Sequence, residues 1–151
     1  MSISIVLADD HVVLREGLRL LLETQPDLKV VGSAADGREA IRVVEYAQPD
    51  VAILDIAMPE MNGLEAARQI QHICPHTRVI MLSMHTDHAM VRTALGAGAL
   101  AYLVKDSATA DLEQALRAVV RGDTYLSPAL SRSVMDSFLR PGATRSSDPV
   151  L

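Results

Sequence analysis

The 151-residue sequence has no tryptophan, one phenylalanine and three tyrosines, so aliphatic side chains must fill its core. Its single cysteine, Cys74, excludes an internal disulfide and fits a reducing cytoplasm. No basic-then-apolar signal segment opens the chain, and the longest apolar stretch, Ala94–Val104, is shorter than the ~20 residues that a membrane span needs. We therefore expect a cytoplasmic protein without a membrane segment.

The sequence also has no excess of positively charged residues. Lys plus Arg number 14 and Asp plus Glu number 19, which gives a formal net charge of −5. This balance argues against the chain binding nucleic acid by itself, because such binding depends on neutralising phosphates with Lys and Arg. The length predicts one domain, large enough to bury ~70% of its unfolded surface.

Short apolar runs alternate with helical periodicity from the start of the chain to about Gly122. This alternation is typical of βα units around a parallel sheet. The expected strands are Ile3–Ala8, Lys29–Ser33, Val51–Leu54, Val79–Leu82 and Ala101–Val104. Two apolar helical stripes are expected, one of Leu14, Leu18, Leu21 and Leu22, the other of Leu112, Ala115, Leu116, Val119 and Val120. Asp36 followed by Glu39 indicates a capped helix start between the second and third strands.

Carboxylates follow two of these apolar runs. Asp9 and Asp10 follow the first, and Asp55 follows the third. The ligand site of an open α/β sheet lies beyond the carboxyl ends of its strands, so neighbouring strands would bring the three groups together. Two carboxylates roughly 5 Å apart repel by about 3 kcal/mol at an effective dielectric of 20. The cluster therefore requires Mg²⁺ or Mn²⁺, a shared proton or much water. The alternative is three solvated aspartates that cap helices.

Two further strands also end in polar groups, Ser83 and Lys105. With the aspartates they form a set suited to phosphoryl transfer. The lone Asp55 can attack phosphorus, a metal and Lys105 can neutralise the oxygens, and Ser83 can hydrogen-bond the acquired group.

In this arrangement the sequence resembles the receiver domain of two-component response regulators, from about Ile3 to Gly122. The resemblance implies a flavodoxin-like (CheY-like), doubly wound α/β fold with a five-stranded parallel sheet of order 2-1-3-4-5, here followed by an extra C-terminal helix. The residues that carry the resemblance are Asp9-Asp10, Asp55 within Leu54–Gly63, Ser83, Tyr102, and Lys105 with Asp106.

The resemblance implies a role for each of these positions. Asp55 would accept phosphate from the phosphohistidine of a sensor histidine kinase and would later lose it by autodephosphorylation, so the chain is not expected to be a metabolic enzyme. Asp10, Asp55 and the backbone carbonyl of Ala57 would bind Mg²⁺ directly, and Asp9 through water. The other roles concern the phosphoryl group: Lys105 would pair with its oxygens, Ser83 would hydrogen-bond them, and Tyr102 would swing inward behind Ser83.

The end of the sequence, Gly122–Leu130 and beyond, resembles the receiver-to-linker segment of NarL/LuxR-type regulators. Residues 1–124 are expected to form the receiver, 125–140 a C-terminal helix opened by Ser127-Pro128, and 141–151 a flexible linker. The resemblance implies a DNA-binding helix-turn-helix domain outside this chain and a homodimer on phosphorylation, through the first and fifth helices.

Two other functions remain open at this stage. A stand-alone receiver would act by protein contact or phosphorelay. A phosphohydrolase of the haloacid-dehalogenase type would need a second aspartate where this chain has Ala57. Within the receiver interpretation, Ala57, Met84 and His85 are expected to rim the site and to set how easily water attacks the acyl phosphate.

Overall fold

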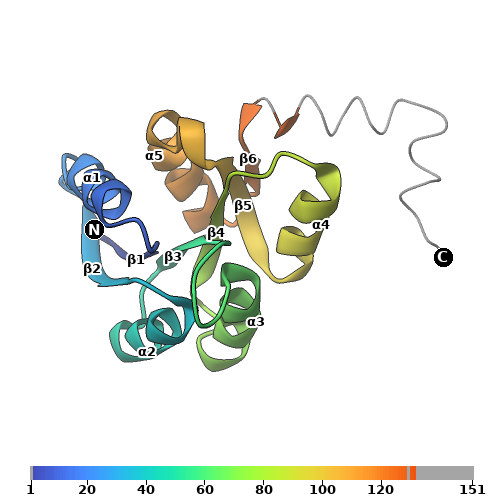
Figure 1. The fold of residues 1–151 in the computed structure, drawn as a ribbon. Helices are drawn as coiled ribbons and strands as arrows, with labels where there is room; N and C mark the ends of the chain where they lie inside the picture. The colour runs from blue at the N-terminus through green and yellow to red at the C-terminus, as the bar shows by residue number, and fades with distance from the viewer. Residues whose placement is uncertain (1, 129, 132–151) are drawn as a thin grey trace, which may run out of the picture.

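The computed structural model describes residues 2–128, 130 and 131, which form one parallel sheet with helices on both faces (Figure 1). Its elements, in chain order, are β1 (Ile3–Ala8), α1 (Val12–Leu22), β2 (Leu28–Ala34), α2 (Gly37–Ala47), β3 (Val51–Asp55), α3 (Gly63–Ile73), β4 (Arg78–Ser83), α4 (His88–Gly96), β5 (Ala99–Val104), a 3₁₀ turn (Lys105–Ser107), α5 (Ala108–Val120) and β6 (Tyr125–Leu126). All five expected strands are present, within two residues of their predicted ends.

The sheet has the order β2-β1-β3-β4-β5-β6, and every pairing is parallel. This confirms the predicted doubly wound fold, with β6 as an additional sixth strand. Tyr125 and Leu126, the first two residues of the expected 125–140 helix, instead pair with Ala101 and Tyr102 of β5. The free edge of β5 offers unpaired backbone groups, and these two residues satisfy them.

The backbone becomes helical at Pro128, where the amides of Leu130 and Ser131 donate to the carbonyl oxygen of Ser127. This fits a helix opened by Ser127-Pro128. Residues 132–140 of the expected helix and the expected linker, 141–151, lie outside the described residues.

Two apolar cores lie on the two faces of the sheet. Helices α2, α3 and α4 cover one face, and α1 and α5 cover the other (Figure 1). Successive side chains of a strand point to opposite faces, so neighbours such as Ile53 and Leu54 belong to different cores. Both faces of the central strands are therefore buried, which explains their continuous apolar runs.

Local sequence signals account for most helix ends. The Asp36 side chain accepts a hydrogen bond of 2.8 Å from the Glu39 amide, as the capping pattern predicts. Gly122, just after α5, has a φ of +87°, which glycine adopts without strain.

The predicted α1 stripe is right for Leu18 and Leu22, but Leu21 is 39% exposed because it lies at the flank of the buried face. No helix in the described part of the chain has the length and apolarity to cross a membrane.

Candidate functional site

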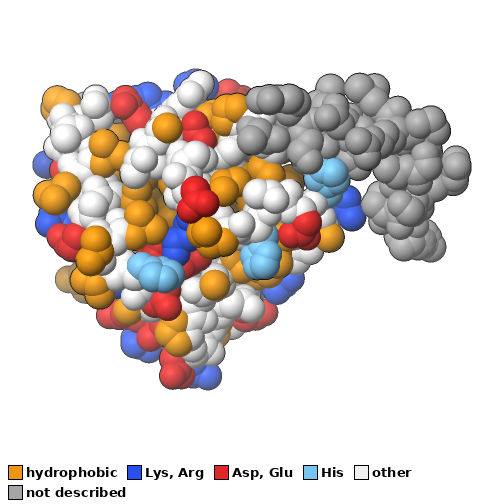
Figure 2. Space-filling view, turned by 45° about the horizontal axis from the view of Figure 1, so that its top comes forward, with side chains coloured by type: hydrophobic (Ala, Val, Ile, Leu, Met, Phe, Trp, Pro, Cys, Tyr) orange, Lys and Arg blue, Asp and Glu red, His pale blue; other side chains and the backbone are white. Residues whose placement is uncertain are grey.

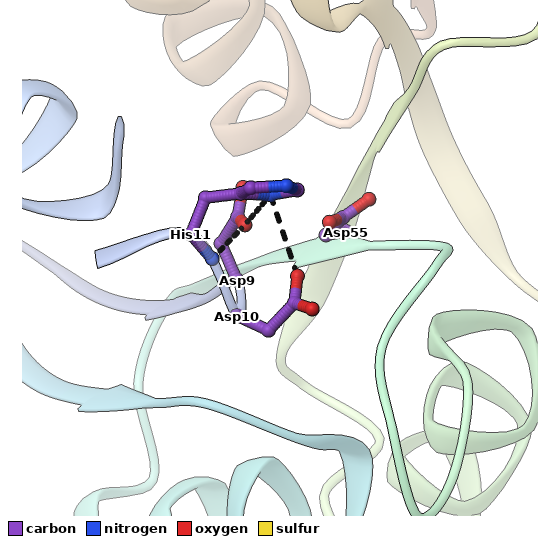
Figure 3. Close-up of side chains that lie close together, drawn as sticks. All are labelled: Asp9, Asp10, His11 and Asp55. Atoms are coloured by element: carbon purple, nitrogen blue, oxygen red, sulfur yellow. Dashed lines mark hydrogen bonds and ion pairs between the residues drawn. The ribbon is translucent and has the colours of Figure 1, made fainter. Parts of the chain in front are cut away.

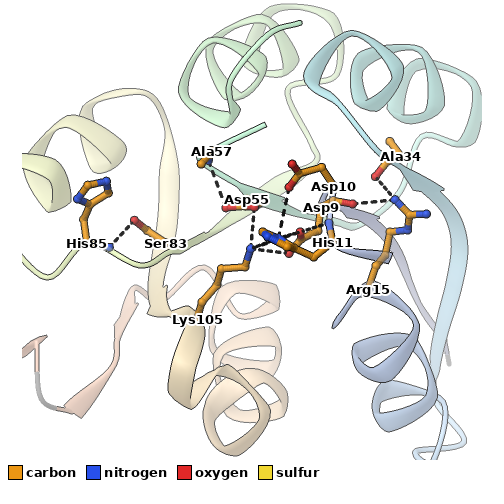
Figure 4. Close-up of polar contacts among 10 residues, drawn as sticks. All are labelled: Asp9, Asp10, His11, Arg15, Ala34, Asp55, Ala57, Ser83, His85 and Lys105. Atoms are coloured by element: carbon orange, nitrogen blue, oxygen red, sulfur yellow. Dashed lines mark hydrogen bonds and ion pairs between the residues drawn. The ribbon is translucent and has the colours of Figure 1, made fainter. Parts of the chain in front are cut away.

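Four strands deliver polar side chains to one edge of the sheet. Asp9 follows β1, Asp55 ends β3, Ser83 ends β4 and Lys105 follows β5. These strands are consecutive neighbours in the sheet, so Asp9, Asp55 and Lys105 meet at this edge, with Ser83 beside them and turned toward His85 (Figure 4). All four residues are at most 9% exposed. The predicted set therefore lies in one place, and the polar groups there must find partners among themselves, with water or with a ligand.

Lys105 lies at the centre of this group. Its Nζ donates to Asp55 Oδ2 at 2.8 Å and to Asp9 Oδ1 at 3.3 Å, and it lies 3.2 Å from Asp9 Oδ2 (Figure 4). The other oxygen of Asp55, Oδ1, accepts a hydrogen bond of 3.2 Å from the Ala57 amide. The lysine thus links the ends of β1 and β3, the two strands that carry the acidic residues.

The charges in the pocket do not balance, which affects the pKa of both partners of the central ion pair. Burial acts to lower the pKa of Lys105, but its hydrogen bond to Asp55 and the charges of Asp55 and Asp9 outweigh burial and raise this pKa. Burial raises the pKa of Asp55 against the opposing hydrogen bond from Lys105, and the charge of Asp9 adds to the rise. The lysine therefore stays protonated, and the pocket still carries excess negative charge.

The acidic residues are arranged in a way that fits a divalent cation. One ligand atom from each of Asp9, Asp10, His11 and Asp55 can be chosen so that all four lie within 4.8 Å of one another (Figure 3). Asp9 is 2% exposed, and its Oδ2 is paired only with Lys105 Nζ, at 3.2 Å. One ammonium group cannot balance three carboxylates, and carboxylate oxygens suit Mg²⁺. The carboxylate cluster expected from the sequence is therefore present.

Ser83 and Tyr102 are connected through His85. The Ser83 Oγ accepts a hydrogen bond of 2.9 Å from the His85 amide (Figure 4), and the Tyr102 hydroxyl donates to the His85 carbonyl oxygen at 2.9 Å. Tyr102 is fully buried, and burial raises the pKa of its hydroxyl. The tyrosine thus lies in the inward position, bonded to the loop that follows Ser83.

The loop after Asp55 is held close to β3. The Gly63 amide donates to the Ile56 carbonyl oxygen at 2.9 Å, and a Cβ at Gly63 would collide with the backbone carbonyl of Asp55. The Asn62 side chain accepts from the Glu65 amide at 2.9 Å and so caps α3. Asn62-Gly63 therefore has a structural role, because it starts α3 and lets the helix lie against the end of β3.

Comparison with known proteins agrees with this arrangement. The sequence profile of the response regulator receiver domain matches residues 5–117. The chain belongs to this family. The receiver is similar to the transcriptional regulatory protein YhcZ of Bacillus subtilis (strain 168), with 44% identity over 131 residues that cover 87% of this chain and 61% of YhcZ. It spans between 59% and 66% of the length of five such relatives.

Solved structures show the same fold. A two-component response regulator of the LuxR family from Aurantimonas sp. SI85-9A1 has a TM-score of 0.88 and 34% identity, covering 93% of this chain and 100% of that one. The signal receiver domain of the response regulator NarL from Mycobacterium tuberculosis has a TM-score of 0.76 and 36% identity, covering 80% and 98%. The family resemblance expected from the sequence is confirmed, and the phosphohydrolase alternative loses its support.

Two residues of the receiver pocket were missed by sequence reasoning. The residue pattern indicates no chemistry for His11, yet its Nδ1 lies 2.8 Å from Lys105 Nζ. Arg15 donates through one guanidinium nitrogen to the carbonyl oxygens of Asp9, at 2.7 Å, and Ala34, at 3.1 Å (Figure 4). The arginine thereby ties the ends of β1 and β2. His11 is the residue that caps the start of α1, and Arg15 lies in the first turn of that helix.

A recess of about 670 Å³ opens beside the receiver pocket. Figure 2 shows hydrophobic side chains around a small area of basic, acidic and histidine side chains on this face. Met84 lines the recess together with His11 and Lys105, whereas Ala57 and His85 are not among its lining residues. Of the three residues expected to rim the site, Met84 is therefore the one placed on this recess.

Proposed function

We propose that this receiver is phosphorylated on Asp55 by a sensor histidine kinase in a Mg²⁺-dependent reaction and controls a transcription-regulating output. The observation that carries this proposal is the 2.8 Å ion pair between Lys105 and the buried Asp55, inside a pocket that Asp9 and Asp10 make acidic. Family membership supports the same role.

The residues supply a coherent chemistry for this step. One oxygen of Asp55 forms a bond to phosphorus while the phosphorus–nitrogen bond of the kinase phosphohistidine breaks, and the electron pair of that bond returns to the imidazole nitrogen. Mg²⁺, held by Asp10, Asp55, the Ala57 carbonyl and, through water, Asp9, would neutralise charge that develops on the phosphoryl oxygens. Lys105 stays protonated in the pocket and can neutralise the oxygens on the other side.

Ser83 and Tyr102 would convert the modification into a change of shape. A phosphoryl group adds about −1.5 to −2 charges and three acceptor oxygens. Ser83 lies at the end of β4, next to the acceptor strand, and its hydroxyl proton can bond such an oxygen. Only contacts that differ between the two states can shift the equilibrium. Because the His85 backbone is hydrogen-bonded to both Ser83 and Tyr102, movement of Ser83 should be transmitted to His85 and Tyr102. We therefore expect the change of shape in residues 87–121.

The proposal is tested on the isolated receiver with acetyl phosphate and Mg²⁺. Intact-mass and peptide mass spectrometry should find one added phosphoryl group, on Asp55. Asp55→Asn should stay unmodified, while Asp123→Asn, at an aspartate with a 62% exposed side chain, should react as the parent does. Phosphate on another residue, or none, would falsify the proposal. Beryllofluoride with Mg²⁺ should bind the parent and not Asp55→Asn.

The transcriptional output is proposed from the relatives. Several relatives from Bacillus subtilis and Brevibacillus brevis are transcriptional regulatory proteins, and each matches at least 87% of this chain. We propose that a DNA-binding domain outside this chain supplies the output, and that the protein acts in the cytoplasm. Reading the codons after Leu151 tests this directly, because a helix-turn-helix sequence is expected there. A stop codon at that point would favour the stand-alone receiver.

Phosphorylation-dependent homodimerisation is the remaining part of the proposal. Helix α1 exposes Val12, Val13 and Leu20 at 59%, 87% and 61%, which gives it an apolar outer surface. We expect beryllofluoride with Mg²⁺ to double the mass measured by light scattering. Leu20→Glu should weaken the dimer. A monomer under all conditions would remove this part and leave the Asp55 chemistry intact.

A further inference from the structure

The chain after β6 continues to bind the edge of β5 beyond the two residues that form the strand itself. The Ser127 amide donates to the Tyr102 carbonyl oxygen at 3.2 Å, and the Ser127 Oγ accepts from the Val104 amide, also at 3.2 Å. Ser127 is 2% exposed. The last residue of β5 is therefore held by a side-chain oxygen, in the place that a backbone carbonyl would take in a longer β6.

The Ser127 hydroxyl is directed at β5, although its sequence position before Pro128 is that of a helix cap. A capping serine accepts, through its side chain, the amide of a residue two or three positions inside the helix. Here the Leu130 amide donates to the Ser127 carbonyl oxygen at 2.9 Å, while the hydroxyl oxygen takes the Val104 amide. Capping therefore does not explain where this hydroxyl lies.

Val104 is placed where it can affect the receiver pocket. It is half-buried, pairs in register with Ser83 of β4 and directly precedes Lys105. The backbone leaves the sheet at this point, because Lys105 begins a 3₁₀ turn. The position of the Val104 backbone thus sets the point from which the Lys105 side chain extends.

That starting point matters because Lys105 acts at hydrogen-bond distance. Its Nζ lies 2.8 Å from Asp55 Oδ2 and 3.3 Å from Asp9 Oδ1 (Figure 4). Lysine carries its charge on a flexible four-carbon stem, so the place where the stem is anchored contributes to the place where the charge acts. Misplacement of a reacting or neutralising group by about 1 Å can cost about 100-fold in rate.

We propose that Ser127 is a positioning residue for the phosphoacceptor chemistry. Its hydroxyl oxygen holds the Val104 amide and the end of β5, and so fixes the Lys105 ammonium beside Asp55. The proposal rests on the proposed function, which gives Lys105 its role toward a phosphoryl group. It goes beyond that function because Ser127 lies outside residues 5–117, which match the receiver profile.

The first test measures the rate at which acetyl phosphate labels Asp55 at saturating Mg²⁺. Ser127→Ala should lower this rate about tenfold. Its Mg²⁺ affinity, measured by calorimetry, should stay at the parent value, because the acidic residues follow β1 and end β3 rather than β5. Ser127→Thr keeps the hydroxyl oxygen and should restore the rate. Equal rates in the parent and Ser127→Ala would overturn the proposal, and so would a parallel fall in rate and Mg²⁺ affinity.

Ser131→Ala is the matched control. Ser131 belongs to the same segment, but its hydroxyl donates to the Leu126 carbonyl oxygen at 3.5 Å, so this bond stays within the segment. The variant should label at the parent rate. A loss of rate equal to that of Ser127→Ala would assign the effect to the segment as a whole and contradict the role given to Ser127.

The second test observes Lys105 directly in the folded protein. The chain contains two lysines, Lys29 and Lys105, so ¹³C-labelled lysine gives two ε-carbon resonances. The Lys105 resonance should move toward that of the exposed Lys29 in Ser127→Ala, while the Lys29 resonance stays unchanged. Loss of stability alone does not shift a native-state resonance. A Lys105 resonance that keeps its parent position in Ser127→Ala would refute the positioning role.

Failure of this inference is distinct from failure of the proposed function. No labelling of Asp55 in the parent would remove the proposed function, whereas the lysine spectra, recorded without a phosphate donor, would still decide whether Ser127 positions Lys105. Labelling of the parent and Ser127→Ala at the same rate would remove the role of Ser127 and leave phosphorylation of Asp55 intact.

Discussion

The Ser127 Oγ accepts a hydrogen bond of 3.2 Å from the Val104 amide, and the Ser127 amide donates to the Tyr102 carbonyl oxygen at the same distance. Ser127 is 2% exposed and follows β6, while Val104 directly precedes Lys105. Leu130 packs in the same apolar core as Tyr102. The segment after α5 is thus bonded to β5, the strand that carries Tyr102 and directly precedes Lys105. Movement of β5 would therefore be transmitted to the segment that follows α5.

Ser127→Ala should destabilise the protein because it leaves the half-buried Val104 amide without its partner. A lost partner of this kind costs about 1–2 kcal/mol of unfolding free energy. Urea denaturation followed by circular dichroism measures the difference. Ser33→Ala, at an exposed position of the edge strand β2, should change the free energy by less than about 0.5 kcal/mol. Equal midpoints for the parent and Ser127→Ala would show that this hydrogen bond contributes nothing.

Lys105→Met should lower stability in metal-free buffer, because it leaves the buried Asp55 and Asp9 carboxylates without a counter-charge. Removing one partner of a buried ion pair costs about 3 kcal/mol or more. Thermal unfolding with EDTA and then with Mg²⁺ should show a larger rise in melting temperature for the variant than for the parent. Lys29→Met, at the exposed Lys29 of β2, is the matched control. An equal response to Mg²⁺ in all three would contradict this account of the pocket.

Asp10→Asn should have the opposite effect in the absence of metal. Asp10 has a 37% exposed side chain, and its charge repels those of Asp9 and Asp55 while Lys105 balances only part of the cluster. Removing one negative charge should stabilise the metal-free protein by about 1 kcal/mol. The same change should reduce the stabilisation by Mg²⁺. Unchanged melting temperatures with and without metal would mean that the three carboxylates do not interact.

The fold and the acidic cluster were predictable because their signals are local. A buried parallel strand requires a continuous apolar run, and four of the runs here, those of β1, β3, β4 and β5, end in or precede a polar residue at the sheet edge. β6 was not predictable in this way, since Tyr125 and Leu126 are too few to show a period and pair only because β5 offers a free edge. The position of His11 beside Asp9 depends on its extended backbone just before α1, with φ of −89° and ψ of 101°. Such a conformation leaves no trace in the residue pattern.

Met84→Ala is expected to shorten the lifetime of phosphorylated Asp55. Met84 is 60% exposed and lines the recess beside Lys105, so its removal should open the approach of water to the acyl phosphate. His85→Ala belongs to the same hypothesis, although its side chain is 59% exposed and outside the recess lining. Loss of phosphate is followed by mass spectrometry after removal of acetyl phosphate. Val31→Ala, on β2, serves as the control, and identical lifetimes in every variant would exclude Met84 and His85 from this role.

The ion pair between Asp27 and Arg117 should make stability depend on pH in a defined window. Arg117 donates to both carboxylate oxygens of Asp27, at 2.8 and 3.1 Å, and so joins α5 to the start of β2. This hydrogen bonding lowers the pKa of Asp27 from its ordinary value of 3.8. The native state therefore binds this proton less readily than the unfolded state, and the pair stabilises the protein above that value. Its contribution is lost as pH falls through the depressed pKa.

Urea unfolding should show Asp27→Asn to be less stable than the parent at pH 7, with the difference shrinking below about pH 4. Asp123→Asn removes an exposed aspartate and should show no such convergence. A gap between parent and Asp27→Asn that stays constant down to the acid transition would mean that the carboxylate charge does not contribute.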